Sequence, residues 1–260
     1  MKIGLCQIQN TSNLSSNIST ILRCCEIASK ECDLIVFPEC ALTGFSPHID
    51  YNEDVLALFF EKLSKLSQAT ETSIVVPTAI PFGERFYNSG FVFHSSGERT
   101  QFYKEGLTVS EQRFFVPGEN HSRVFQVKGY TFALLLCMEA SEPPWTYLNE
   151  DEAVDAILWP GYWGWKESVQ WDESLEKLSR QVHQNMKVWK TPLLQVNFSN
   201  NHPSDKRNVG PEGLSVVVNA ENELVHCAPR IHESISVVTL GERVKAETLV
   251  VLGKGSELEK

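Results

Sequence analysis

The sequence lacks an apolar run long enough to cross a membrane, and its start lacks the apolar core of a signal peptide. Its longest apolar stretches, 132–137 and 216–218, are far shorter than the ~20 residues that a bilayer span requires. The first ten residues, MKIGLCQIQN, carry one lysine and no continuous apolar segment of the ~7–15 residues typical of an export signal. We therefore expect a cytoplasmic protein without a membrane partner.

The sequence also has no excess of basic residues. Lys and Arg number 23 against 33 Asp and Glu, which gives a formal net charge of −10. Nucleic-acid binders normally present a basic surface, so we expect neither nucleic acid nor an anionic membrane as a partner. A hydrophobic content of 42% in 260 residues is that of an ordinary globular protein, and we expect one domain over 1–260, its last ~20 residues forming a tail or a dimer contact.

Metal-binding and phosphate-binding patterns are absent as well. The seven cysteines include no C-x-x-C pair, so neither a zinc ribbon nor a thioredoxin motif is indicated. The sequence contains no G-x-G-x-x-G and no Walker A motif. Most cysteines are expected to be reduced and to fill apolar core positions. A redox-sensing thiol protein that uses Cys24 and Cys25, or Cys32 and Cys40, is a less favoured alternative.

Short apolar segments alternate with helical patterns along the chain. Helices are predicted at 15–29, 55–66 and 173–185 from apolar residues at helical spacing. Strands are predicted at 2–9, 33–37, 73–76, 86–94, 99–103, 124–127, 130–137, 156–158, 193–197, 213–219, 224–228 and 235–240, the last being the final strand expected. Pro77 is expected to end the strand at 73–76. This order favours an α/β fold in which helices cover the sheets.

Three chemically reactive residues stand at the ends of predicted strands. Glu39 follows the apolar run LIVF, Lys104 follows TQFY, and Cys137 follows FALLL. Each has an ordinary explanation: a helix cap or ion pair for the acid, a solvated surface position for the lysine, and core packing for the cysteine. Together they supply a nucleophile, a general base to deprotonate it, and a cation to stabilise an oxyanion.

Sequence blocks around these residues are similar to those of a known family. In chain order, FPECALTGF, YKEGLTVSEQRFFVPG and LLLCMEASEPPW resemble the three signature blocks of the nitrilase superfamily of carbon–nitrogen hydrolases. Further downstream, VDAILWPGYW resembles the family's strand leading to a pocket tryptophan. RQVHQN resembles its A-R-A-x-E-N helix end, with Gln184 in place of the usual Glu. The resemblance covers about residues 1 to 240.

The resemblance assigns roles to individual residues. It implies that Cys137 is the nucleophile, Glu39 the general base and Lys104 the oxyanion-stabilising cation, with the Met138 backbone N–H as a second oxyanion donor. Glu111 falls near a second acid that many members place beside the lysine, although a surface ion pair is an alternative for it. The resemblance also implies a four-layer α-β-β-α sandwich, a homodimer or higher homo-oligomer, and a reaction that requires no metal or organic cofactor.

The sequence departs from the family pattern after the cysteine. Many amidases of the family continue C-Y-D-x-R-F-P-E, whereas this chain has Glu139 for the acid and Ser141 in place of the arginine. The change weakens any transfer of substrate specificity and favours, as an alternative, a catalytically silent ligand-binding or scaffold protein. A small amide or carbamoyl substrate is preferred to a nitrile because the chain is short, like the compact branches of the family.

Five tryptophans cluster in the same half of the chain. They are Trp145, Trp159, Trp163, Trp165 and Trp171. Packing is expected for most of them. Trp163 is the candidate for the wall of a substrate pocket.

Overall fold

The computed structural model describes residues 1–45, 51–142, 146–149, 152–165, 190–199, 210–211 and 213–252. Two long helices lie side by side in this part of the chain. Helix α1 spans Leu14–Ala28 and helix α2 spans Glu53–Thr70. An asparagine caps each helix: Asn13 accepts a hydrogen bond from the Ser16 amide, and Asn52 one from the Val55 amide. These helices confirm two of the predictions, whereas the helix predicted at 173–185 lies outside the described residues.

The first sheet has eight strands, of which seven follow in one line and the eighth, β6, pairs with β4. In spatial order the line is β16 (Lys245–Leu252), β15 (Glu233–Thr239), β1 (Lys2–Gln7), β2 (Leu34–Val36), β3 (Ser73–Phe82), β4 (Arg85–Phe93) and β5 (Arg99–Tyr103), and β6 is Phe115–Val116. Strands β1, β2 and β3 are parallel. Their neighbours on both sides are antiparallel.

The second sheet has six strands around a similar parallel centre. In spatial order they are β14 (Leu224–Cys227), β13 (Val216–Val218), β11 (Leu193–Val196), β9 (Ala156–Pro160), β8 (Tyr130–Leu134) and β7 (Val124–Val127). Strands β8, β9 and β11 are parallel, and the outer strands are antiparallel. Strands β10 (Gly164–Trp165) and β12 (Gly210–Pro211) form a separate pair.

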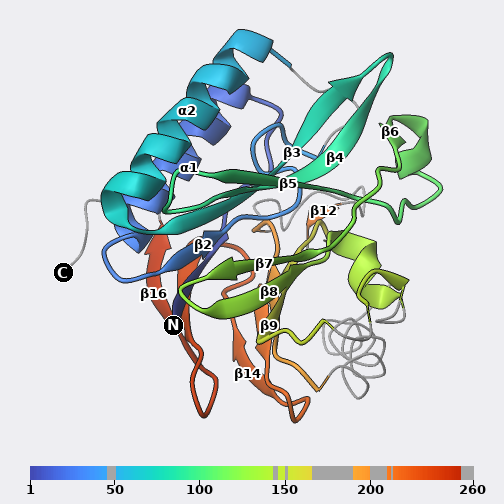
Figure 1. Cartoon of the computed structure of the whole chain (residues 1–260). Helices are drawn as coiled ribbons and strands as arrows, with labels where there is room; N and C mark the ends of the chain where they lie inside the picture. The colour runs from blue at the N-terminus through green and yellow to red at the C-terminus, as the bar shows by residue number, and fades with distance from the viewer. Residues whose placement is uncertain are drawn as a thin grey trace.

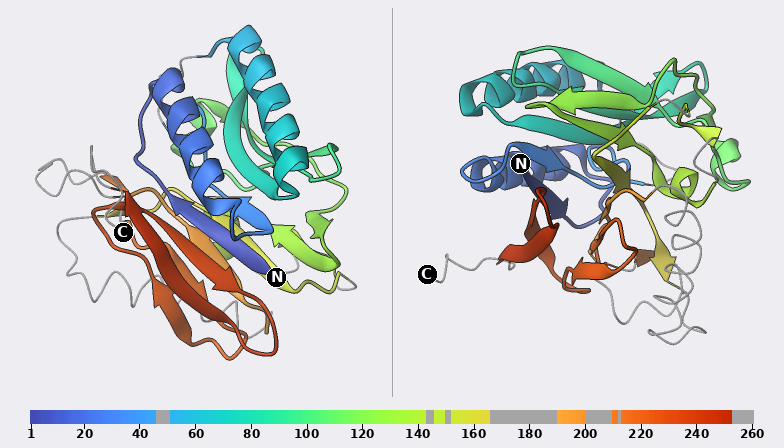
Figure 2. Two further views of the ribbon diagram at one scale, coloured as in Figure 1. Left: turned by 90° about the vertical axis from the view of Figure 1, so that its left-hand side faces the viewer. Right: turned by 60° about the horizontal axis from the view of Figure 1, so that its bottom comes forward.

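The two sheets pack face to face, and the helices cover the outer face of the first sheet (Figures 1 and 2). Strand β2 is buried on both faces, so that Ile35 contacts the helix layer while Leu34 and Val36 contact the second sheet. Gly90 allows the sheets to approach closely, since a Cβ there would lie 2.5 Å from Leu134 Cδ2. These layers confirm the predicted α/β sandwich, and no helix among the described residues is long and apolar enough to cross a membrane.

Several strand predictions differ from the structure in their bounds, and three differences have a physical explanation. Strand β3 continues through Pro77, where the sequence suggested that it would end. Val75 is the last residue of β3 paired with β2, and the Pro77 carbonyl faces the same side, where it accepts a hydrogen bond from the Leu42 amide. The proline nitrogen, which carries no hydrogen, therefore faces the side on which β2 has already ended. The proline removes no hydrogen bond from the sheet.

The other two differences are the end of one strand, β8, and the presence of one further strand, β16. Strand β8 ends at Leu134, three residues before the predicted end, because the chain turns into the short 3₁₀ helix η2, Cys137–Ser141. Strand β16 follows β15, where no further strand was predicted. Its inner neighbour β15 is largely buried, while β16 itself is an edge strand whose side chains are mostly half-buried or exposed. Such a strand carries a weak apolar pattern.

Candidate active site

Glu39 lies in the turn that follows β2, completely buried. Its Oε1 atom accepts hydrogen bonds from Asn88 Nδ2 at 2.8 Å and from Lys104 Nζ at 2.6 Å. Its Oε2 atom is buried and accepts no hydrogen bond from the described residues. The next residue, Cys40, has φ +54°, a left-handed conformation that is uncommon outside glycine. The turn is therefore held in a strained shape, and one carboxylate oxygen is left uncommitted.

Lys104 follows β5 and is also completely buried. Its backbone N–H donates to the Asn88 carbonyl at 2.8 Å, and its carbonyl accepts from the Gly118 amide at 2.9 Å. Its ammonium contacts Glu111 Oε1 at 2.5 Å in addition to Glu39. Strand pairing thus fixes the backbone of the lysine, and two carboxylates fix its side chain.

Glu111 begins the 3₁₀ helix η1, Glu111–Arg113, and is buried. Its Oε2 atom accepts hydrogen bonds from the Thr108 amide and the Thr108 hydroxyl, both at 2.8 Å. The structure therefore places this acid beside Lys104 and away from the surface.

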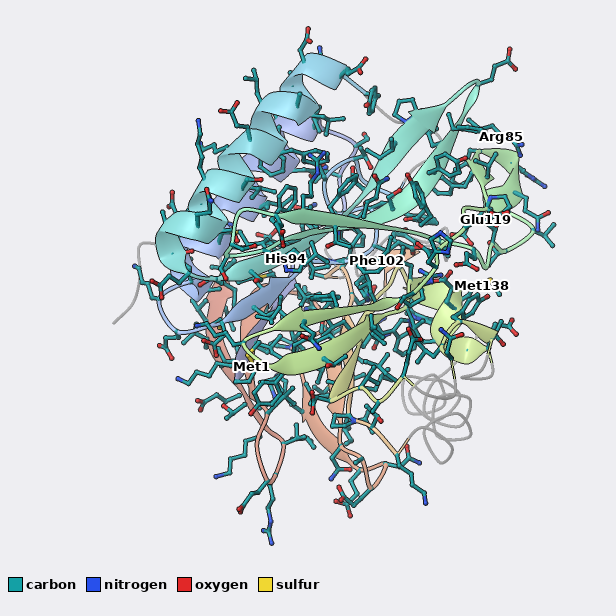
Figure 3. All side chains as sticks on the ribbon, in the orientation of Figure 1. Met1, Arg85, His94, Phe102, Glu119 and Met138 are labelled. Atoms are coloured by element: carbon teal, nitrogen blue, oxygen red, sulfur yellow. The ribbon has the colours of Figure 1, made fainter. Side chains whose placement is uncertain are left out.

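Cys137 is the first residue of η2 and is partly exposed. Its φ is +52°, so the backbone is strained at this residue. The Trp159 indole N–H donates to its carbonyl, and its Sγ lies 3.9 Å from the Tyr162 carbonyl oxygen. Met138, the next residue, lies on the same turn, at the end of the molecule that also carries Glu119 (Figure 3).

Burial and neighbouring charges shift the pKa values of the acid and the lysine. Burial raises the pKa of Glu39 above its usual value; Lys104 opposes this rise, Glu111 adds to it, and the Cys137 thiol lowers it. Burial alone would lower the pKa of Lys104, but the negative charges around it, led by Glu39, raise it well above the ordinary value. The lysine is therefore charged at neutral pH.

The thiol of Cys137 belongs to the same electrostatic cluster. Burial raises the pKa of Cys137, and the Glu39 carboxylate raises it further, while Lys104 lowers it. The resting cysteine is therefore a neutral thiol beside Glu39 and the Lys104 ammonium. The structure brings together the three residues that the sequence singled out, and Glu111, which the sequence placed beside the lysine, lies in the same cluster.

Trp163 lies on the segment after β9. Its ring packs edge to face against the buried Trp159, with centroids 5.2 Å apart, and its amide donates to Asn197 Oδ1 at 3.2 Å. A Cβ at Gly161 would come within 2.9 Å of the Trp163 ring and 3.9 Å of Cys137 Cα. The Trp163 ring and the Cys137 backbone therefore both lie beside Gly161, and Trp159, against which Trp163 packs, binds the Cys137 carbonyl.

The other predictions for tryptophans and cysteines divide between described and undescribed residues. Trp145 and Trp171 lie outside the described residues, as do the side chain of Trp165 and the segment RQVHQN with Gln184. The cysteines of the redox alternative are buried free thiols. Burial raises the pKa of Cys32 to about 12, and a thiol with so high a pKa forms little thiolate and reacts slowly.

Sequence reasoning missed Asn88. This buried residue donates to Glu39, accepts the Lys104 amide, and lies 3.6 Å from the Cys40 sulfur. The available signal was an asparagine in the middle of a predicted strand, followed by the apolar residues of FVF. A buried amide of this kind requires hydrogen-bond partners. Within the described ranges, no three His, Cys, Asp or Glu side chains converge as metal ligands would.

Comparisons with known proteins agree with this geometry. The family model for carbon–nitrogen hydrolases matches residues 2–242. An (R)-stereoselective amidase from Pseudomonas sp. is 30% identical to this chain over 147 residues. The match covers 55% of this chain and 53% of the amidase, so the chain spans about half the length of this curated relative.

Solved structures show the same fold. An amidase from Nesterenkonia sp. AN1, in a mutant form with acrylamide added to its active-site cysteine, superposes with a TM-score of 0.76 at 19% identity, covering 93% of each chain. A carbon–nitrogen hydrolase from Helicobacter pylori G27 superposes with a TM-score of 0.74 at 18% identity, covering 90% of this chain and 87% of the other. The family match over nearly the whole length confirms the resemblance seen in the signature blocks, and the chain belongs to the carbon–nitrogen hydrolase family.

Proposed function

We propose that the protein hydrolyses the C–N bond of a small linear amide through a thioester on Cys137. The observation that carries the proposal is the buried contact between Glu39 and Lys104, at 2.6 Å, next to a thiol whose charge state both residues influence. A base, an oxyanion-stabilising cation and a nucleophile in one cluster are the requirements of acyl transfer.

In the first half-reaction, the Cys137 sulfur attacks the amide carbonyl and Glu39 accepts the thiol proton. The free Oε2 atom of Glu39 is the acceptor, because Oε1 already binds Asn88 and Lys104. The tetrahedral oxyanion is stabilised by the Lys104 ammonium and the Met138 N–H, an amide in the first turn of η2. Glu39 then returns the proton to the nitrogen, the C–N bond breaks, and ammonia leaves.

In the second half-reaction, water attacks the thioester carbonyl while Glu39 takes a proton from the water. The same two donors stabilise the second oxyanion. The C–S bond breaks, the sulfur regains its proton from Glu39, and a carboxylic acid is released. Glu111 keeps Lys104 in place through both steps, since its carboxylate holds the ammonium at 2.5 Å.

Support for an amide substrate comes from the named relatives, an amidase of Pseudomonas sp. and an amidase of Nesterenkonia sp. AN1. Trp163 forms one wall of the substrate site in this proposal, because its ring packs on Trp159, whose indole N–H binds the Cys137 carbonyl. Its indole N–H is buried and has no hydrogen-bond partner among the described residues, so it is available to an acceptor group on a substrate.

We test this function by measuring ammonia released from small linear amides, N-carbamoyl compounds and nitriles. We expect release from amides, and Cys137→Ala should reduce it by at least about 10³-fold. Cys227→Ala is the matched control because Cys227 is also a partly exposed free thiol, and it should retain full activity. Ammonia release that persists in Cys137→Ala would refute the mechanism, and a folded wild type inactive on all three classes would favour the silent-scaffold alternative.

The assembly and compartment remain part of the proposal. The family resemblance implies a homodimer, and large apolar side chains are exposed on β14, on β16 and before β15, namely Leu224, Val251 and Ile231. A second copy of the chain would cover such residues. Light scattering on the purified protein should give twice the monomer mass, and fractionation of cells should recover the protein in the cytoplasm.

A further inference from the structure

A second buried cluster of charges lies next to the candidate active site, centred on Glu139. This carboxylate is completely buried two residues after Cys137. Its Oε2 atom accepts a hydrogen bond from the Leu136 amide at 2.8 Å. Its Oε1 atom accepts from the Glu105 amide at 2.7 Å and from the Gly106 amide at 3.2 Å. One side chain therefore binds two loops that are distant in sequence.

The two loops are the ones that carry the reacting groups. Leu136 is the residue before the nucleophile Cys137, and Glu105 is the residue after Lys104. The contact between the loops is close, since a Cβ at Gly106 would lie 3.2 Å from Glu139 Cγ. Glu139 thus sets the distance between the backbone of the sulfur-bearing turn and that of the lysine-bearing loop.

The cation that balances Glu139 is Arg123, which precedes β7 and is only 1% exposed. Its Nη2 atom donates to Glu139 Oε1, and its Nε lies 3.5 Å from Glu105 Oε1. The guanidinium stands over the Tyr147 ring, 5.4 Å from the centroid. The Arg123 carbonyl accepts the amide of Leu134, the last residue of β8, at 3.0 Å. The arginine is therefore anchored to the second sheet.

Burying an arginine and an acid together gives little net stability, because desolvation of the two charges offsets their attraction. Stability is thus a weak reason for this pair. The arrangement does determine geometry, because the guanidinium is planar and directional and Glu139 has both oxygens occupied by donors from the two loops.

We propose that Arg123 and Glu139 form a positioning pair that fixes the Cys137 turn against the Lys104 loop from the side of the second sheet. The inference rests on the proposed amide hydrolysis. Neither residue contacts the reacting atoms. Their effect is on the alignment of sulfur, ammonium and carbonyl, which matters most in the tetrahedral transition state.

The test uses Arg123→Met, Arg123→Lys, Glu139→Gln and the double variant Arg123→Met/Glu139→Gln. Because misplacement by ~1 Å can cost about 10²-fold, we expect Arg123→Met to lower kcat by about 10- to 100-fold while KM stays within about 3-fold. Arg123→Lys, which keeps the charge but not the planar contact, should recover about half of that loss on a logarithmic scale. The double variant should lose no more than the worse single variant, since the two residues act as one unit.

A matched control is available at the other end of the same strand. Lys128 directly follows β7 and pairs with Asp33 at 2.6 Å, but its side chain is 47% exposed. Lys128→Met removes the same charge, and it should leave kcat and KM unchanged. Thermal unfolding of every variant shows whether the protein is folded. If Arg123→Met does not fold, the kcat of Arg123→Lys tests the positioning pair in its place.

A second readout separates this inference from the proposed function. The rate at which iodoacetamide alkylates Cys137, measured by peptide mass spectrometry, needs no substrate. If Cys137 is reactive in the wild type, Glu39→Gln should suppress its alkylation. Arg123→Met should lower the alkylation rate by about 5-fold or more. An unreactive wild-type Cys137 would contradict the proposed function itself. Two results in a protein whose wild-type Cys137 is reactive would overturn the positioning pair alone. One is that alkylation and kcat are unchanged in Arg123→Met. The other is that the losses of the two single variants add in the double variant.

Discussion

Two acids, Glu39 and Glu139, are both completely buried next to Cys137, yet their surroundings differ. Glu139 uses both carboxylate oxygens, which receive donors from two loops and from Arg123. Glu39 uses one oxygen, and its Oε2 atom has no hydrogen-bond partner among the described residues. An acid whose two oxygens both accept hydrogen bonds can hold its neighbours but does not take up a proton readily. An acid with a free oxygen beside a thiol can take up the thiol proton.

The cations that face these acids differ in a parallel way. Lys104 presents a compact ammonium, which can serve Glu39, Glu111 and a substrate oxyanion in turn. Arg123 presents a planar guanidinium, which suits a fixed contact with Glu139. The comparison suggests that the first cluster performs chemistry and the second one holds it in shape.

The largest effect should separate the two acids. Glu39→Gln removes the general base, and we expect turnover to fall by about 10³-fold or more. Glu139→Gln removes one acceptor and one charge outside the reacting atoms, so its loss should be about 10- to 100-fold. Both are measured as kcat on the best amide of the panel. A Glu139→Gln variant that is less active than Glu39→Gln would invalidate the division of roles.

The next effect concerns stability as well as activity. Lys104→Met leaves the carboxylates of Glu39 and Glu111 buried without their cation, and breaking a buried pair in this way costs about 3–5 kcal/mol. Urea denaturation at pH 7 measures the loss. Because the pKa of Lys104 is raised well above 10.5, its stabilising contribution is fully present below that pH and is lost only as the pH rises through the higher folded value.

A control tests whether the unpaired carboxylates cause this loss. Lys104→Met combined with Glu111→Gln leaves one buried charge instead of two, so it should be more stable than Lys104→Met alone. Equal stability of the two variants would show that packing of the lysine stem, rather than charge, accounts for the loss.

A smaller effect is expected on the pH profile. The Glu111 carboxylate helps to raise the pKa of Glu39, and it also draws on the Lys104 ammonium that opposes this rise. Glu111→Gln should therefore lower the pKa of Glu39. Since Glu39 must be ionised to accept the thiol proton, the acid limb of kcat/KM should move to lower pH. A limb that moves to higher pH would mean that Glu111 stabilises the ionised base.

The sequence was sufficient to single out Glu39, Lys104 and Cys137, which the structure places in one cluster, because each one follows a buried strand and each has a chemistry that completes the others. Their roles in catalysis are part of the proposal. The sequence was also sufficient for α1 and α2, for most strands, and for the sandwich implied by the signature blocks. The 3.6-residue period and the continuous apolar runs are local signals, and burial in the structure obeys them.

The sequence was insufficient where pairing in space decides the role of a residue. Asn88 matters because β4 and β5 pair so that its carbonyl meets the Lys104 amide. Arg123 gives no local sign that it reaches Glu139, 16 positions further on, across a sheet edge. Pro77 continues a strand because β2 is short, which is a property of another segment. Each case depends on the register between elements, which a single sequence does not display.

The smallest effect comes from an ion pair with the same length as the Lys104–Glu39 contact but a different environment. Lys65 and Glu61 on α2 lie 2.6 Å apart, as Lys104 and Glu39 do, but their side chains are 72% and 60% exposed. Lys65 lowers the pKa of Glu61, so any stability from the pair is present at neutral pH and is lost as the pH falls through the lowered value. Water already solvates both charges, and Lys65→Met should therefore shift the thermal unfolding midpoint by no more than about 1 °C. A loss as large as that of Lys104→Met would mean that distance rather than burial governs these pairs, and the contrast drawn between the buried clusters and the surface would have to be abandoned.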